Sequence, residues 1–378
     1  MIQRADATSQ PVTDPRQGYS AADFNFSPLI AFYEVTRACN LLCKHCRAEA
    51  QPHRHPLELD TATSLRLLDA LAGFPKPPML VLTGGDPIKR HDVFDLVEHA
   101  VELGLKTAMT PSATKLVTSE AVTRLKNAGL HRLAVSLDGA DAARHDTFRG
   151  VPGSFQRTLE IMRDARAVNL PMQINTTISR HNFDQIDEMA HLLVAHGILM
   201  WSVFFLVPTG RGLAEQRIAP WEYEVAFEKL YQHSLIQPYQ IKTTEAPHYR
   251  RFLLQRSGWQ PGRKNTACPQ TIPGMVGTND GRGVMFISHI GEIYPSGFMP
   301  ILCGSFPKDS PVNVYQYSPM FQSLRDPNQI KGKCGFCQYR EICGGSRARA
   351  YALTGDPLES EPDCVHVSLR STRSGALC

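Results

Sequence analysis

The chain has 378 residues, of which 42% are hydrophobic and 20% charged, with a formal net charge of +4. This composition argues against a disordered chain, and the length allows one large domain together with a smaller one. Because the charge is small and no run of five or more like charges occurs, we expect no nucleic-acid partner.

The sequence also argues against export and membrane insertion. Its first residues, MIQRADATSQPVTDPRQGYS, lack the apolar segment of a signal peptide. The longest apolar stretch, Ile198 to Val207, is much shorter than the ~18–20 residues that span a bilayer. We therefore expect a cytoplasmic protein with no membrane partner.

The first half of the chain shows a regular βα rhythm. Residues 1–28 are polar and predict a loosely packed N-terminal arm, and from residue 29 short apolar runs alternate with amphipathic segments. The apolar runs, read as strands, are Ile30–Val35, Met79–Leu82, Lys106–Met109, Leu133–Leu137, Met172–Thr177 and Trp201–Val207. The predicted helices cover 61–72, 92–103, 118–129, 154–168 and 183–196. Six such units predict an α/β fold, a partial (β/α)6 TIM-like barrel over residues 29–214.

The second half has a different pattern. Residues 215–265 read as a polar, helical connector. The runs Val284–Ser288 and Glu292–Tyr294 flank Gly291 and predict a β-hairpin. We therefore predict a second domain over residues 266–366, followed by a tail at 367–378.

A first group of cysteines follows the first predicted strand. Cys39, Cys43 and Cys46 lie within eight residues. Three thiolates in one loop can hold three irons of a [4Fe–4S] cluster and leave the fourth iron without a protein ligand. Such an open position can bind a substrate molecule, as an open zinc position does. The alternative is a structural zinc site, whose candidate fourth ligands would be His45, His53 and His55.

This segment, EVTRACNLLCKHCRAEA, resembles the cluster-binding loop of the radical S-adenosylmethionine (SAM) superfamily in its cysteine spacing, its position, and its residues Thr36, Asn40 and His45. The resemblance implies that the open iron binds SAM and that one electron cleaves SAM to methionine and a 5′-deoxyadenosyl radical. This radical then takes a hydrogen atom from the substrate. The resemblance also implies an electron donor such as flavodoxin or ferredoxin.

The same resemblance implies SAM contacts at the ends of the predicted strands. The implied contacts are His45, Gly84, Gly85, Asp86, Pro87, Ser136, Asp138, Arg149 and Asn175. The tetrapeptide GGDP matches the family's GGEP-type loop, with Asp86 where Glu is commoner, and Arg149 matches an arginine that often meets the SAM carboxylate. The alternatives are an ordinary surface arginine for Arg149 and a polar core residue for Asn175.

A second group of cysteines lies near the end of the chain. Cys334, Cys337, Cys343 and Cys364 supply four ligands, which close a metal site and suit electron storage or a structural role. Zinc is the alternative, since four cysteines can also bind it tetrahedrally.

The segment KCGFCQYREICGGSRARAYALTGDPLESEPDC resembles the C-terminal SPASM/twitch extension of radical SAM enzymes, which implies an auxiliary [4Fe–4S] cluster. Two cysteines of the full SPASM pattern are missing, because Ser296 and Arg347 stand at their positions. We therefore expect one auxiliary cluster in a twitch-like domain. Cys268 and Cys303 remain open as additional ligands.

Within the superfamily, the LTGGDP loop and the segment CGGSRARAYALTGD resemble members of the haem b and haem d1 pathways. This implies hydrogen abstraction from a tetrapyrrole side chain, with oxidative decarboxylation or other modification of a propionate. Arg347 or Arg349 could bind such a propionate, or could form salt bridges that hold the cluster loop.

Two other functions remain open. One is radical modification of a ribosomally made peptide, for which a leader-binding domain would be a separate protein. The other is non-catalytic electron transfer, which would need neither GGDP nor an open iron position.

Overall fold

The computed structural model describes residues 19–259 and 277–367. Cys268, Cys378 and the predicted domain boundary at 265/266 lie outside the described residues. The strands are β1 (Ile30–Thr36), β2 (Met79–Gly84), β3 (Thr107–Met109), β4 (Arg132–Ser136), β5 (Met172–Ile178), β6 (Met200–Phe205), β7 (Gln240–Thr244), β8 (Val284–Ile287), β9 (Glu292–Tyr294) and β10 (Gly304–Ser305).

The helices lie mainly outside the strands. They are α1 (Thr61–Ala72), α2 (Val93–Glu102), α3 (Ser119–Asn127), α4 (Ala142–Arg149), α5 (Ser154–Ala167), α6 (Ile186–Val194), α7 (Pro220–Ile236), α8 (His248–Arg256), α9 (Pro311–Tyr317), α10 (Pro319–Arg325), α11 (Gly332–Gly335) and α12 (Arg347–Thr354). None of the helices in the described ranges is long and apolar enough to span a bilayer.

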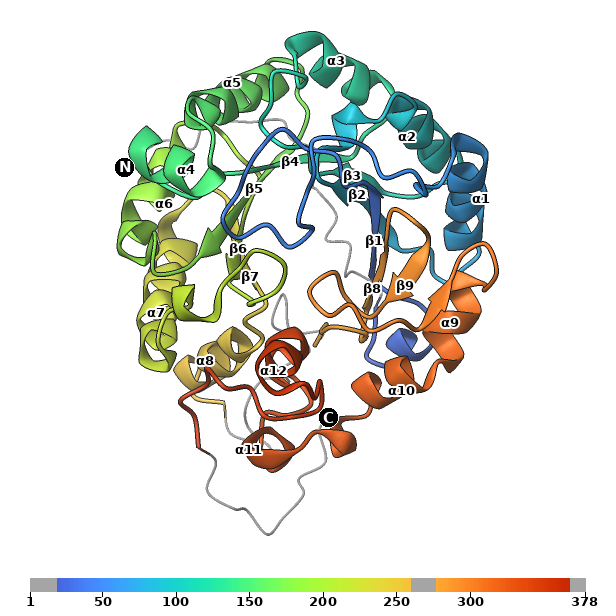
Figure 1. Cartoon of the computed structure of the whole chain (residues 1–378). Helices are drawn as coiled ribbons and strands as arrows, with labels where there is room; N and C mark the ends of the chain where they lie inside the picture. Colours follow the sequence, from blue (N-terminus) through green and yellow to red (C-terminus); the bar gives the residue numbers. More distant parts are fainter. Residues whose placement is uncertain (1–18, 260–276, 368–378) are drawn as a thin grey trace.

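All the strands of the described residues belong to one open sheet in the order β10-β9-β8-β1-β2-β3-β4-β5-β6-β7. Neighbours from β8 through β1 to β7 pair in parallel, and β9 pairs antiparallel with β8 and β10. Figure 1 shows the strands curved into a partial barrel with helices outside, and α12 on the side between β7 and β8. The predicted partial TIM-like barrel is therefore confirmed.

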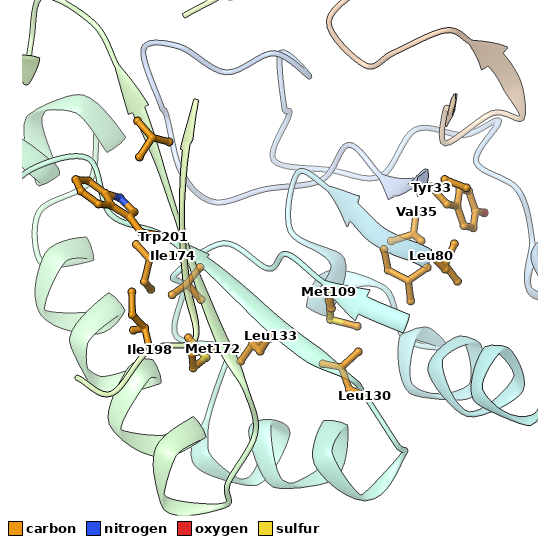
Figure 2. Close-up of a cluster of buried hydrophobic side chains, with 14 of the residues drawn as sticks. Tyr33, Val35, Leu80, Met109, Leu130, Leu133, Met172, Ile174, Ile198 and Trp201 are labelled. Atoms are coloured by element: carbon orange, nitrogen blue, oxygen red, sulfur yellow. The ribbon is translucent and has the colours of Figure 1, made fainter. Parts of the chain in front are cut away.

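The main hydrophobic core fills the space between the strands and the outer helices. Tyr33, Leu80, Leu133 and Trp201 are fully buried there (Figure 2). Along β5 (Met172–Ile178) buried and half-buried residues alternate, so the apolar residues and Thr176 face the helices, and the other polar residues, Gln173, Asn175 and Thr177, face the barrel interior.

The six predicted strands and five predicted helices are present, with ends within two residues of prediction, except that the 183–196 helix begins as a 3-10 turn (Phe183–Gln185). The hairpin is confirmed as β8 and β9, and β8 also extends the main sheet beside β1. Two elements of the barrel and connector were missed, and β10, α9, α10, α11 and α12 in the second half were not predicted either. The predicted helical connector contains β7, whose sequence QIKTT is too short and polar to signal a strand, and α4 (AARHDTFR) has few apolar residues.

The described part of the predicted N-terminal arm packs against the C-terminal half. Phe24 is buried, and the Tyr315 hydroxyl donates a hydrogen bond of 2.9 Å to its carbonyl oxygen. The same hydroxyl accepts a hydrogen bond of 3.0 Å from the Gly283 amide next to β8. Residues 19–28 therefore link the start of the barrel to the hairpin region.

Candidate active site and second cysteine cluster

The first cysteine group lies in the loop that follows β1, at the carboxyl ends of the parallel strands. Helix α4 holds this loop, because the amides of Leu42 and Lys44 donate hydrogen bonds of 3.1 and 3.0 Å to the carbonyls of Arg149 and Phe148. Carbonyls at the end of a helix lack partners within the helix, so they are available for such contacts. The missed helix thus positions the predicted cluster loop.

The three thiols gather in one small group, in which Cys39 and Cys43 are buried and Cys46 is half-buried. The amide of Ala50 donates to the Cys46 sulfur at 3.4 Å, and Nη1 of Arg149 donates to the Cys43 sulfur at 3.6 Å. Burial raises the pKa of the Cys43 thiol, and the positive charge of Arg149 opposes that increase. Donors aimed at sulfur suit thiolates that ligate a metal cluster.

Gly84, the last residue of β2, and Gly85, which follows it, pack directly on the cysteine loop and the end of β1. The Gly85 amide donates a hydrogen bond of 2.8 Å to the Thr36 carbonyl. A Cβ atom at Gly85 would lie 2.5 Å from the Ala38 oxygen and 2.6 Å from the Arg37 oxygen, both backbone atoms. Glycine is therefore required here for close packing of two loops, whether or not the backbone also approaches a ligand.

We expect Gly85→Ala to lower the iron content of the first cysteine site as well as SAM cleavage, because the added methyl group forces the cysteine loop away. The measurement is iron per chain after anaerobic reconstitution. Gly104→Ala is the control, because Gly104 lies in the turn between α2 and β3 and its Cβ would meet no atom within 4 Å. Its positive φ of 79°, which Gly85 does not share, strains only that turn and should leave the iron content unchanged. Normal iron content in Gly85→Ala would contradict this packing role.

The Asp86 carboxylate is turned toward the loop after β3. It accepts hydrogen bonds from the Thr114 hydroxyl at 2.7 Å and from the Ser112 amide at 3.3 Å. Burial raises the pKa of Asp86 to about 6. Pro87 is buried at the start of a 3-10 turn. These two residues thus connect neighbouring loops.

A cleft with about 450 Å³ of empty space, open solvent included, lies beside the cysteine loop. Four of the predicted SAM contacts line it: Gly84, Gly85, Ser136 and Arg149. The other five, His45, Asp86, Pro87, Asp138 and Asn175, are not among its lining residues. The strand ends therefore bring part of the predicted set to one cleft.

Asp138 connects the cysteine loop, α4 and β5. Its carboxylate forms an ion pair with Arg149 and accepts a hydrogen bond of 2.7 Å from the Thr177 amide. Burial alone would raise the pKa of Asp138, but the charge of Arg149 reverses the effect and lowers it. His45 lies 3.9 Å from the same carboxylate and stacks on Phe148 at 4.1 Å, and burial lowers its pKa to about 3.

Among the cleft residues that sequence reasoning missed, His145 and Ser112 carry polar side chains next to predicted site residues. The Asp138 amide donates a hydrogen bond of 3.1 Å to Nδ1 of His145, whose Nε2 is buried without a partner in the described part of the chain. The Ser112 hydroxyl lies 3.2 Å from the Cys39 sulfur. The only signal for His145 was its position in HDTFRG beside Arg149. Asn175 lies on the inner face of β5, where its side chain accepts a hydrogen bond of 2.7 Å from Gln173.

The second cysteine group surrounds a separate cavity with about 370 Å³ of empty space, open solvent included. All four predicted ligands line it: Cys334, Cys337, Cys343 and Cys364. The Glu361 amide donates to the Cys334 sulfur at 3.2 Å, and the Gly345 amide donates to the Cys343 sulfur at 3.4 Å. Cys303 lines neither this cavity nor the cleft, and packs against the main core instead.

Neither cysteine group is preformed as a tetrahedral zinc site. Within residues 19–259 and 277–367, no group of three or more His, Cys, Asp or Glu side chains is arranged to hold a single metal ion. A tetrahedral zinc site needs its ligands at about 2.0–2.3 Å from one centre.

Arg347 and Arg349 are both buried and hold the second cysteine loop. Arg349 pairs with Glu361 at 3.0 Å and with Asp363 at 3.3 Å, and it donates to the Leu206 carbonyl at the end of β6 at 3.4 Å. Arg347 donates to backbone carbonyls at residues 345, 357 and 359. Of the two interpretations of these arginines, the contacts favour the structural one over propionate binding.

We expect Arg349→Met to lower the free energy of unfolding by about 3–5 kcal/mol, because the buried carboxylate of Glu361 loses its cationic partner and Asp363 keeps only Arg217 as a cationic partner. Urea unfolding followed by circular dichroism measures the change. Lys331→Met is the control: Lys331 pairs with Asp356 at the surface, so its loss should change stability little. Equal stability of both variants would show that the buried network does not support the domain.

Comparison with known proteins identifies the protein family. Residues 33–193 match the Radical SAM superfamily model. The chain is 38% identical over 343 residues to the AdoMet-dependent heme synthase of Methanosarcina barkeri, covering 90% of this chain and 97% of that protein. It is 28% identical to the pre-heme d1 synthase of Dinoroseobacter shibae, covering 89% of this chain and 85% of that protein.

Among solved structures, SuiB of Streptococcus suis bound to its precursor peptide SuiA superposes with a TM-score of 0.71 at 17% identity. The match covers 91% of this chain and 78% of SuiB, and it supports the shared fold. A radical SAM enzyme uses SAM and a [4Fe–4S] cluster. The chain therefore belongs to the radical SAM superfamily, in the haem-pathway branch that includes the AdoMet-dependent heme synthases.

Proposed function

We propose that this radical SAM enzyme acts on a tetrapyrrole and converts a propionate side chain to a vinyl group. The observation that carries the proposal is the 38% identity, over nearly the whole of both chains, to a protein named as a heme synthase. The structural relation to SuiB, at 17% identity, supports the fold and not a peptide substrate.

The cysteine loop after β1 would hold the catalytic cluster through Cys39, Cys43 and Cys46, and this cluster with SAM supplies the 5′-deoxyadenosyl radical. The buried sulfurs and the donors from Ala50 and Arg149 support this assignment. The cleft beside the loop would hold SAM, with Gly84, Gly85, Ser136 and Arg149 as its wall.

The remaining predicted contacts would act mainly through other residues. Asp138 would hold Arg149 in place, and Asp86 would fix the loop after β3 against the cleft. His45 would contribute the face of its imidazole ring, which stacks on the Phe148 ring. Pro87 and Asn175 would shape the neighbouring turn and the inner face of β5.

The reaction needs an electron acceptor. Loss of one hydrogen atom from the propionate carbon next to the ring leaves a carbon radical. Release of carbon dioxide then forms the vinyl group and frees one electron. We propose that Cys334, Cys337, Cys343 and Cys364 hold an auxiliary [4Fe–4S] cluster that accepts this electron. The cavity lined by all four cysteines supports the assignment.

The proposal further includes a small one-electron donor such as flavodoxin or ferredoxin, a cytoplasmic location, and no nucleic-acid or membrane partner. An electron carrier is needed because each SAM cleavage consumes one electron. The small net charge of +4 supports the absence of a nucleic-acid partner.

The test is anaerobic incubation of the reconstituted enzyme with SAM, dithionite and iron-coproporphyrin, followed by mass spectrometry of the porphyrin. The expected product has lost carbon dioxide from its propionates and depends on SAM. Turnover of a peptide library with no change in the porphyrin would favour the peptide-modifying function instead. Absence of 5′-deoxyadenosine with every substrate would favour a non-catalytic electron carrier.

A further inference from the structure

A buried histidine lines the second cysteine cavity. His248, the first residue of α8, is fully buried, and neither of its ring nitrogens has a hydrogen-bond partner among the described residues. Its neighbours around the cavity include all four cysteines of the second group. Buried polar groups in folded proteins nearly always have partners, so this histidine requires an explanation.

Aromatic side chains hold the His248 ring in place but form no hydrogen bond with it. Tyr223 and Phe227 pack against the imidazole, with ring centroids 5.0 and 4.9 Å away. A buried nitrogen without a hydrogen-bond partner destabilises the fold, and here the ring has two such nitrogens. An imidazole carries at least one N–H donor in either protonation state, so an acceptor is expected within the cavity.

Cationic side chains also line the cavity that His248 faces. Arg251, Lys333 and Arg340 lie around it together with one acidic residue, Glu361, which pairs with Arg349. Arg251 is largely buried, with its side chain 5% exposed, and it pairs with Glu224, which does not line the cavity. Among the described residues, Lys333 and Arg340 donate hydrogen bonds to neutral oxygens. Such a wall favours a negatively charged occupant.

We propose that His248 donates a hydrogen bond to a sulfur of the auxiliary cluster and, with the surrounding cations, raises the reduction potential of that cluster. The inference rests on the proposed function, because it assumes that the cavity holds the electron-accepting cluster. Reduction adds negative charge, so N–H donors and cations near the sulfurs stabilise the reduced state. His248 is thus a positioning residue that makes the cluster a better acceptor for the substrate electron.

The test measures the midpoint potential of the auxiliary cluster in the full chain. Cys39→Ala/Cys43→Ala/Cys46→Ala is the parent background, so that one cluster alone contributes to the signal. His248→Phe keeps the ring size between Tyr223 and Phe227 but removes both nitrogens. We expect it to lower the potential by about 59 mV or more, which corresponds to a tenfold change in the ratio of reduced to oxidised cluster.

Two further variants make the result specific. His248→Gln keeps an N–H donor, so its midpoint potential should lie between those of the parent and of His248→Phe. His233→Phe is the matched control, because His233 is also buried but contacts Asp187 and Gln237 and does not line the cavity. We expect His233→Phe to leave the potential unchanged.

The outcomes separate the inference from the proposed function. A parent protein without iron in this cavity would overturn both. A normal cluster with the same potential in the parent and His248→Phe would overturn the inference alone, and would assign the free nitrogens to a buried water. An equal shift in His233→Phe would also overturn it, because the effect would then be unspecific.

Discussion

Replacing Cys39, Cys43 and Cys46 together by alanine should abolish SAM cleavage and lower the bound iron from about eight to about four per chain. The reason is that these thiols supply every protein ligand of the proposed catalytic cluster. Without the cluster no electron reaches SAM. The measurements are iron per chain and 5′-deoxyadenosine released with dithionite and SAM, with or without substrate.

The matched control for this variant is Cys303→Ala. Cys303 is half-buried and lines neither the cleft nor the second cavity, so its loss should change neither measurement. If the triple variant keeps all of its iron, the catalytic cluster has been assigned to the wrong cysteines.

Replacing Cys334 and Cys337 by alanine should leave SAM cleavage largely intact while product formation falls to less than about a tenth. The proposed catalytic cluster would be ligated by a different loop, so the radical should still form. The substrate electron, however, loses its proposed acceptor. The ratio of decarboxylated porphyrin to 5′-deoxyadenosine measures the uncoupling.

This second variant needs a folding control, because ligation of a cluster can itself stabilise a small domain. Circular dichroism and limited proteolysis should therefore match the unmodified enzyme before activity is compared. Product formation at the normal rate by a folded Cys334/Cys337 variant would show that the auxiliary cluster is structural.

The barrel could be predicted well from the sequence, because the patterns that indicate its strands and helices are local. Apolar runs and helical periodicity appear within single elements, and the parallel order places the ends of β1, β2 and β4 at one edge. This is why Gly84, Gly85 and Ser136 could be expected beside the cysteine loop. β7 was missed because its strand character depends on pairing with β6, which is not visible in five mostly polar residues.

Side-chain roles in the site were harder to predict, because they depend on distant partners. Arg349 meets Glu361 nearby in the chain but also the carbonyl of Leu206, 143 residues away. Nothing in the sequence distinguishes such an arginine from one that binds a carboxylate substrate. His248 likewise lies 86 or more residues before the cysteines whose cavity it lines, so only the fold reveals it.

Deuterium transfer from the substrate to SAM-derived product tests the central claim most directly. The enzyme is incubated anaerobically with SAM, dithionite and iron-coproporphyrin labelled with deuterium at the propionate carbons next to the ring. We predict deuterium in 5′-deoxyadenosine together with a decarboxylated porphyrin. Unlabelled 5′-deoxyadenosine beside an unchanged porphyrin would contradict the assignment of a tetrapyrrole propionate as the site of radical attack.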